Sequence, residues 1–204
     1  METKIAKIIS YVFHPILMPT YALLFLMFFQ YSFFSLTIPL NIKWLILTMI
    51  FITTVLFPLL SIFIMLRKGM IRSLKMESRQ ERIYPFITTA IFYYLSYYLL
   101  SRIQISYVFH ILILGSTLLI ITALFINFFW KISIHMIAIG GVLGTFLGLS
   151  VLAILNIPQF ILLLILISGI IGFSRLKLNA HNSAQVYAGF LTGTLMMFSL
   201  VYFM

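Results

Sequence analysis

The sequence predicts an all-α integral membrane protein, a polytopic bundle of about seven transmembrane helices. Two observations lead to this fold class. Of the 204 residues, 63% are hydrophobic and only 8% are charged, and the mean hydropathy is +1.19. A soluble domain carries about a quarter charged residues, so without a bilayer this chain would expose too much apolar surface. The apolar runs are also continuous, whereas the strands of a membrane barrel alternate in polarity over about 10 residues.

Seven apolar segments follow one another, and a helix that crosses a bilayer needs roughly 17 to 25 such residues. They cover residues 8–29, 40–66, 84–101, 106–129, 135–155, 157–173 and 184–203. The third and the sixth are at the short end of this range. The polar stretches between them are short, and we find neither a second domain nor a repeat, so we expect a single integral membrane domain over residues 1–204.

The first segment resembles a signal peptide at its start, because Lys4 and Lys7 precede an apolar run. No small-residue cleavage site follows it, and the stretch from Leu23 to Phe29 is bulky. We therefore expect a retained first span.

Glycines in the fifth segment recur at helical spacing. They are Gly140, Gly141, Gly144 and Gly148. Small residues on one face of a membrane helix allow a neighbouring helix to approach closely. We interpret this series as a packing surface and not as a ligand site.

Polar residues are concentrated in three stretches of the chain, residues 67–85, 131–135 and 174–185. They follow the second, fourth and sixth spans, and two crossings separate each stretch from the next. All three are therefore expected on the same face of the membrane. Because ionisable groups are costly in lipid and mark functional sites there, we expect the three stretches to form one site between helices.

The chemistry of this predicted site is cationic. Its cations and histidines are Lys75, Arg79, Arg82, Lys131, His135, Arg175, Lys177 and His181. Arg offers phosphate a bidentate fork and Lys a point charge. The only carboxylates nearby are Glu77 and Glu81, cysteine is absent, and zinc usually takes three protein ligands, so we expect no metal and no other cofactor. Two histidines beside cations permit metal-free phosphoryl transfer, one as nucleophile and the other as general acid.

The third polar stretch carries the most specific motif. Ser174-Arg175, five residues and then His181 read S-R-x5-H. This pattern resembles the third signature of the type 2 phosphatidic acid phosphatase superfamily, S-R-x5-H-x3-D. The family's Asp corresponds to Gln185 here.

The other two signatures of that superfamily occur in the same order. Residues 132–135, Ile-Ser-Ile-His, are similar to P-S-G-H and keep Ser133 and His135. Lys75, six residues and then Arg82 resemble K-x6-R-P, although the proline here is Pro85. The motifs at 75–85, 132–135 and 174–185 place the resemblance over residues 70–195. It implies a six-helix phosphatase-like core plus an extra helix.

The resemblance also implies roles for these residues. His181 would be the nucleophile that forms a phosphohistidine, and His135 the general acid for the leaving alkoxide. Gln185 would orient His181. The phosphate would be bound by Lys75, Arg82, Ser133, Ser174 and Arg175.

The implied activity is that of a membrane-embedded, metal-independent hydrolase. Members of the superfamily dephosphorylate phosphatidic acid, phosphatidylglycerol phosphate or polyprenyl diphosphate. The expected partners are thus a phospholipid or isoprenoid phosphate substrate and the lipid bilayer. Nucleic acid is not expected, because no soluble domain presents a basic face. The sequence does not indicate an oligomeric state.

Two departures from the signatures keep an alternative open. Gln185 supplies no charge, and Ile134 cannot easily take the backbone conformations of the family's glycine. The alternative is a non-catalytic relative that binds or translocates a phosphorylated lipid. A transporter unrelated to phosphate is a third reading. The histidines inside spans, His14 and His110, are expected to form hydrogen bonds within the bundle.

The distribution of Lys and Arg predicts the orientation. The face with the three polar stretches carries Lys4, Lys7, Arg67, Lys68, Arg72, Lys75, Arg79, Arg82, Lys131, Arg175 and Lys177. The other face carries Lys43 and Arg102. Positive-inside reasoning places the first face in the cytoplasm, although many bacterial relatives act on the outer face of the inner membrane. We expect a protein of the bacterial inner membrane with a cytoplasmic site.

Overall fold

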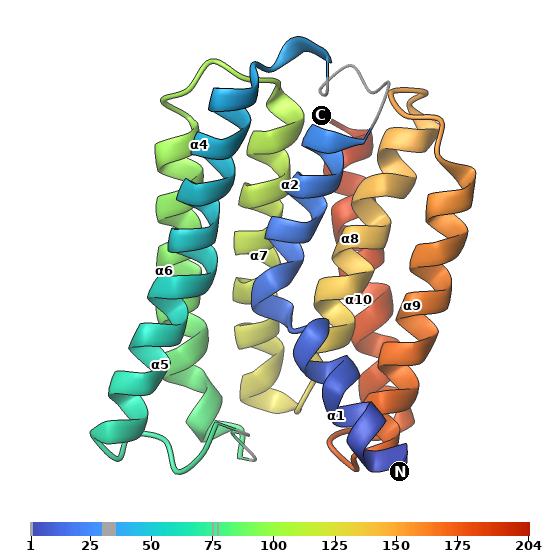
Figure 1. The fold of residues 1–204 in the computed structure, drawn as a ribbon. Helices are drawn as coiled ribbons and strands as arrows, with labels where there is room; N and C mark the ends of the chain where they lie inside the picture. The colour runs from blue at the N-terminus through green and yellow to red at the C-terminus, as the bar shows by residue number, and fades with distance from the viewer. Residues whose placement is uncertain (1, 30–35, 75, 77) are drawn as a thin grey trace. The chain divides into compact units, whose positions relative to one another are not determined.

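The computed structural model describes residues 2–29, 36–74, 76 and 78–204. Within these ranges the chain is helical and contains no strand, and seven helical segments are long and apolar enough to cross a membrane (Figure 1). The segments are Glu2–Phe28, Leu40–Arg67, Gln80–Leu100, Tyr107–Phe129, Ile134–Val151, Pro158–Lys177 and Ser183–Tyr202. The predicted fold class, an all-α membrane protein of about seven spans, is therefore confirmed.

Several of these segments consist of more than one helical element. In chain order the elements are α1 (Glu2–Val12), η1 (Pro15–Leu17), α2 (Met18–Phe28), α4 (Leu40–Phe51), η2 (Ile52–Leu56), α5 (Phe57–Arg67), η3 (Gln80–Arg82), α6 (Ile83–Leu100), α7 (Tyr107–Phe129), α8 (Ile134–Val151), α9 (Pro158–Lys177) and α10 (Ser183–Tyr202).

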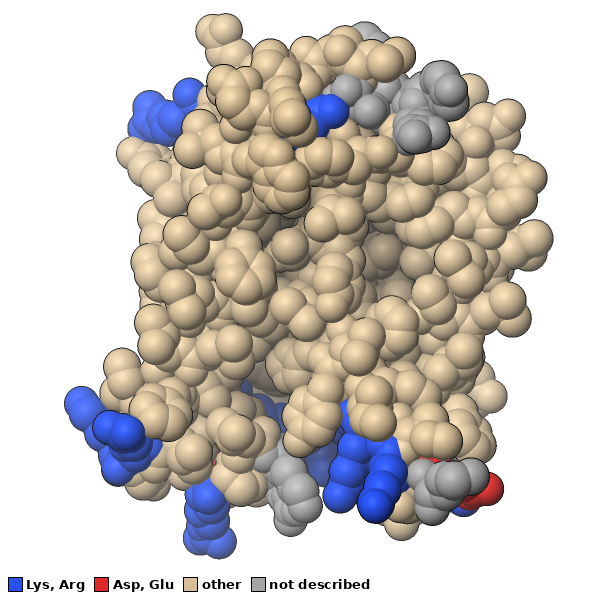
Figure 2. All heavy atoms as spheres, viewed as in Figure 1, with Lys and Arg blue, Asp and Glu red and all other residues tan. Residues whose placement is uncertain are grey.

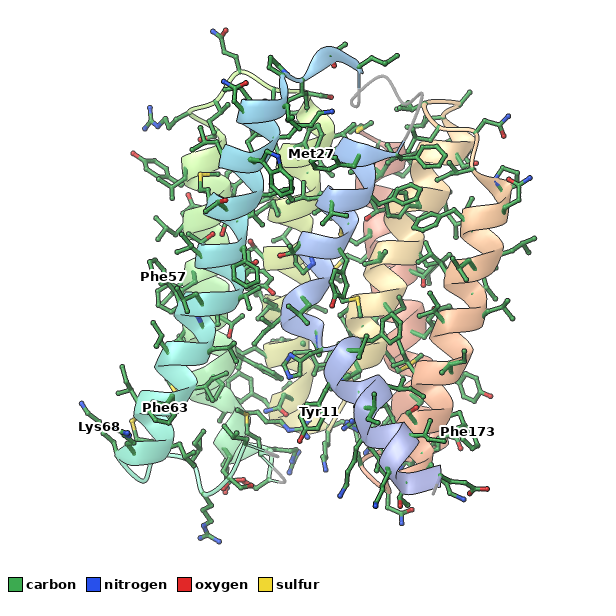
Figure 3. The ribbon with its side chains drawn as sticks, in the orientation of Figure 1. Tyr11, Met27, Phe57, Phe63, Lys68 and Phe173 are labelled. Carbon is green, nitrogen blue, oxygen red and sulfur yellow. The ribbon has the colours of Figure 1, made fainter. Side chains whose placement is uncertain are left out.

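Large apolar side chains are exposed along the spans. Among them are Phe63 on α5 and Phe173 on α9, which are 47% and 60% exposed (Figure 3). On the face drawn in Figure 2, Lys and Arg lie near helix ends. Exposed apolar surface on this scale is what a helix presents to lipid, with charges left for the headgroup region.

The chain divides into two compact units. The first unit comprises Met1–Met18 and Phe125–Met204, and the second comprises Pro19–Leu124. The first unit thus holds α1, η1, α8, α9 and α10, while the second holds α2, α4, α5, α6 and most of α7. The expectation of one domain over residues 1–204 stays a prediction.

Glycines hold α8 and α10 together at backbone distance in the first unit. A Cβ on Gly140 would meet the backbone of Phe190 and Thr194, and a Cβ on Gly193 would meet the backbone of Ile137 and Gly141. Only residues without a side chain allow such an approach. The glycine series is confirmed as a packing surface, and it brings the beginnings of α8 and α10 together.

The first span, Glu2–Phe28, is interrupted. α1 ends at Val12, and His14 adopts an extended conformation with φ −66° and ψ 137°. Pro15 explains the break, because the proline ring disfavours the helical conformation of the preceding residue. The chain then passes through η1 into α2.

The second span carries a π-helical stretch, η2, between α4 and α5. Pro58, near the start of α5, has no N–H to donate to Thr54, four residues earlier. A π turn next to the proline lets the backbone bypass this missing bond. The Thr53 and Thr54 hydroxyls both donate to the Ile50 carbonyl, at 3.2 and 2.8 Å.

Candidate functional site

The candidate site lies in the first unit, where α10 begins. Asn182 is the N-cap of this helix, and its side-chain oxygen accepts a hydrogen bond from the Gln185 N–H (2.9 Å). The Gln185 side-chain oxygen in turn accepts from the Asn182 N–H (3.2 Å). This reciprocal capping box satisfies two of the N–H groups that a helix N-terminus leaves without partners. It also fixes the Gln185 side chain beside His181.

His181 is held by that same glutamine. Its Nδ1 lies 3.0 Å from Gln185 Oε1. Because this oxygen accepts the Asn182 N–H as well, it is the carbonyl oxygen of the amide, and Nδ1 must therefore carry the proton. In the neutral ring the lone pair then resides on Nε2, the atom that a nucleophilic histidine would use.

His135, the second residue of α8, is buried, being only 8% exposed. Its Nε2 lies 3.2 Å from the Ser10 carbonyl oxygen of α1. A carbonyl can only accept, so Nε2 carries a proton and Nδ1 is the ring atom left for proton exchange. The His14 ring lies edge-on to the His135 ring, with 5.5 Å between centroids.

Arg175 lies in the last turn of α9 and also contacts α1. Its Nη1 donates to the Ser10 hydroxyl (3.1 Å). Its Nε is buried and has no hydrogen-bond partner in the part of the chain that the structure describes. Ser10 therefore binds both groups at once, His135 through its carbonyl and Arg175 through its hydroxyl.

The two serines of the motifs occupy different environments. Ser133 is the N-cap of α8, and its N–H makes a long bond to the Gln185 carbonyl (3.4 Å), which joins the beginnings of α8 and α10. Its hydroxyl is buried and has no partner among the described residues. The Ser174 hydroxyl instead donates to the Ile170 carbonyl of its own helix (2.8 Å). The predicted phosphate contacts of both serines stay predictions.

Positive charge prevails in this cluster, which we define as Ser10, His14, Ser133, His135, Arg175, His181 and Gln185. The charge of Arg175 acts on the rings of His14 and His135, and His135 also lies within electrostatic range of His181. Of the carboxylates, Glu2 pairs with Lys177 (2.5 Å), Glu81 lies in the second unit and Glu77 is outside the described residues. A cationic cluster without a carboxylate of its own suits an anion.

The residues of the first signature cannot be assigned to this cluster. Arg82 belongs to the second unit, is buried, and donates through Nε to the Met76 carbonyl (2.9 Å). Lys75 lies outside the described residues. Their contribution to a phosphate site stays a prediction.

Sequence reasoning missed two members of the cluster, Ser10 and His14. His14 was expected to make an ordinary hydrogen bond within the bundle, and its Nδ1 does accept one from the Ile16 N–H (3.4 Å). The sequence did contain a sign that His14 belongs to a functional site. An ionisable residue in a membrane span is costly, and a proline directly after it breaks the helix there. Ser10 gave no such signal, because its partners Arg175 and His135 are far away in the sequence.

Throughout the described ranges, no group of three or more His, Cys, Asp or Glu side chains could hold a metal ion. What the arrangement offers is one oriented imidazole, a second buried imidazole and a guanidinium group.

Fold and cluster together define a class, a helical integral membrane protein with a histidine–arginine cluster at its helix ends. No family model, no curated protein and no solved structure matches the chain. Its resemblance to the type 2 phosphatidic acid phosphatases therefore depends on the three motifs.

Proposed function

We propose that this protein is a membrane-embedded, metal-independent phosphatase of lipid phosphates or diphosphates that acts through a phosphohistidine at His181. The observation that supports this most is the hydrogen bond from His181 Nδ1 to Gln185 Oε1. It gives a histidine in the S-R-x5-H motif the tautomer that a nucleophile at Nε2 requires. The class of protein we have in view is a divergent type 2 phosphatidic acid phosphatase.

The proposed first step is attack of His181 Nε2 on phosphorus. A bond forms between nitrogen and phosphorus, and the bond from phosphorus to the lipid oxygen breaks. With a phosphate anion bound beside it, His135 carries a second proton on Nδ1 and gives it to the leaving alkoxide, because its Nε2 proton is engaged with the Ser10 carbonyl. Arg175 neutralises charge on the phosphoryl oxygens.

In the proposed second step, water attacks the phosphohistidine and His135 takes the proton of that water. Inorganic phosphate leaves, and His181 returns to its starting form. Gln185 orients the ring as a carboxylate would, but it adds no negative charge to stabilise the cationic imidazole. In a serine protease triad the comparable change from Asp to Asn costs about 10⁴ in rate, so we expect slow turnover.

A lipid substrate is supported by where the cluster lies along the spans. His135 is at the beginning of α8, Arg175 is in the last turn of α9, and His181 directly precedes the N-cap of α10. The ends of membrane-spanning helices lie at the depth of lipid headgroups, where a phosphate enters with its acyl or isoprenoid chains still in the bilayer. We further propose the bacterial inner membrane as location and its cytoplasmic face for the site, from the charge count.

A second candidate function remains, a relative that binds or translocates a phosphorylated lipid without hydrolysing it. The neutral Gln185 favours it, because the nucleophile then lacks the family's orienting charge. The binding groups of the cluster would be the same in both cases.

The experiment that separates the two uses the full chain in detergent. Phosphatidic acid, phosphatidylglycerol phosphate and polyprenyl diphosphate are supplied, and phosphate release is measured with and without EDTA. Release that survives EDTA and disappears in His181→Ala supports the phosphatase. Binding of these lipids without release supports the second function. If the protein neither releases phosphate from these lipids nor binds them, both candidate functions are contradicted.

A further inference from the structure

The interrupted first helix is the feature that the motifs leave unexplained. The break after Val12 leaves backbone groups without their helical partners inside a segment that crosses the membrane. Irregular backbone at such a place is tolerated where it is buried in protein or lines a site. Here it carries Ser10 and His14 to His135 and Arg175.

We propose that the interrupted first helix completes the phosphate site, with Ser10 positioning His135 and Arg175 and with His14 donating a hydrogen bond to the phosphate. This inference rests on the phosphate-binding function proposed above. It adds two residues that none of the three motifs includes.

Ser10 acts on both groups through separate atoms. Its carbonyl holds His135 Nε2, and its hydroxyl holds Arg175 Nη1. The guanidinium is thereby fixed at one end, while its buried Nε keeps a donor without a partner in the described chain. A guanidinium fixed in this way, with its buried Nε–H without a partner, is prepared for an anion, because a buried donor gains most from the partner that it lacks.

His14 adds a second donor. Its Nδ1 accepts from the Ile16 N–H, so the neutral ring carries its proton on Nε2. Within the described residues, this nitrogen has no hydrogen-bond partner. The ring lies against His135 and feels the charge of Arg175, so an anion bound there would meet all three groups.

A purely structural role for the interrupted first helix does not explain why buried polar atoms of the cluster lack partners. The Ser133 hydroxyl is fully buried and also lacks a partner among the described residues. Two buried polar atoms without partners in one cluster, Arg175 Nε and Ser133 Oγ, are an unusual cost for packing alone. A phosphate accepts several hydrogen bonds at once and would satisfy both.

The test measures binding of orthovanadate, an analogue of phosphate, to the full chain in detergent. We expect Ser10→Ala to weaken vanadate binding about 5- to 30-fold, and Ser10→Thr, which keeps the hydroxyl, to bind nearly as well as the unchanged protein. Ser168→Ala is the matched control, because the Ser168 hydroxyl donates to Leu164 of its own helix and should not affect binding. In an Arg175→Lys background, Ser10→Ala should have little further effect, since its partner atom is gone.

Variants of His14 test the proposal independently of Ser10. They remain informative if Ser10→Ala lowers the yield of folded protein. We expect His14→Ala to weaken vanadate binding by a similar factor and His14→Gln, which keeps an N–H donor, to restore much of it. His110→Ala in the second unit is the control. If the unchanged protein binds vanadate and Arg175→Ala abolishes binding, but the Ser10 and His14 variants match their controls, this inference is overturned and the proposed function stands. If the unchanged protein does not bind vanadate, both are overturned.

Discussion

The two units of the chain differ in what surrounds their buried polar groups. In the second unit, hydroxyls inside the spans form hydrogen bonds: Ser96 donates to the Thr53 hydroxyl (2.5 Å), Thr53 donates to the Met49 carbonyl and Thr89 donates to the Pro85 carbonyl. Both units also contain buried side-chain atoms without partners in the described chain. In the second unit these include Thr20 Oγ1 and His110 Nδ1, whereas in the first unit Arg175 Nε and Ser133 Oγ belong to one cluster with Ser10, His135 and His181. Hydrogen-bonded hydroxyls stabilise a bundle, whereas unpartnered polar atoms that lie beside a guanidinium and two imidazoles can bind an anion.

The largest expected effect compares one histidine from each unit, His181 in the first and His110 in the second. We expect His181→Ala to lower phosphate release by about 10⁴ or more, because it removes the proposed nucleophile. His110→Ala, in the second unit, should leave release per folded molecule within about twofold. Equal losses in both variants, measured on monodisperse protein, would mean that the units do not differ in function.

The second-largest effect is expected from replacing Gln185, the glutamine of the capping box. Gln185→Asp restores the carboxylate of the family signature beside His181, and we expect release to rise about tenfold or more, because the imidazolium of the transition state gains an opposite charge. Single-turnover rates on phosphatidic acid measure it. Gln159→Asp, an exposed position at the beginning of α9, is the control for added charge. A rate that stays equal to that control would show that Gln185 does not orient the nucleophile.

A third effect concerns stability in the first unit. Gly193→Ala places a methyl group against the backbone of Ile137 and Gly141, so we expect the free energy of unfolding to fall by about 1 to 3 kcal/mol. Thermal unfolding in detergent measures the change. Gly169→Ala on α9 meets open space and should match the unchanged protein or exceed it slightly. The packing account fails if the two variants unfold alike.

The smallest effect is expected in the second unit. Ser96→Ala removes the hydrogen bond to Thr53, and bonds of this kind between membrane helices contribute about 0.6 kcal/mol on average. Unfolding should shift by about this amount, while phosphate release stays unchanged. If Ser96→Ala lowers phosphate release without lowering stability, the second unit contributes to catalysis, contrary to this prediction.

Much of the fold could be predicted from the sequence, because hydropathy is a local property. All seven spans are found where the apolar segments predict them. The break at His14 and the π stretch before Pro58 were not predicted, since a hydropathy average takes no account of a proline's missing N–H or of its effect on its neighbours.

The candidate site could be predicted only in part. The S-R-x5-H motif with Gln185 predicts the bond between His181 and the glutamine, because Gln185 stands where the family signature has the Asp that orients this histidine. The capping box of Asn182 and Gln185 holds the glutamine in place. Ser10 and His14 reach the cluster through contacts with residues more than a hundred positions away. No local spacing encodes such contacts, and the roles of Lys75 and Arg82 in phosphate binding stay predictions for the same reason.

Detection of a phosphohistidine at His181 is the most direct test of the proposed mechanism. The full chain is mixed with phosphatidic acid labelled at phosphorus, quenched under alkaline conditions that preserve phosphohistidine, and mapped by mass spectrometry. We expect phosphate on Nε2 of His181, and slow hydrolysis should let this intermediate accumulate; the label should be absent in His181→Ala. Phosphate release from the unchanged protein with no label on His181, or with the label on another residue, would contradict the account.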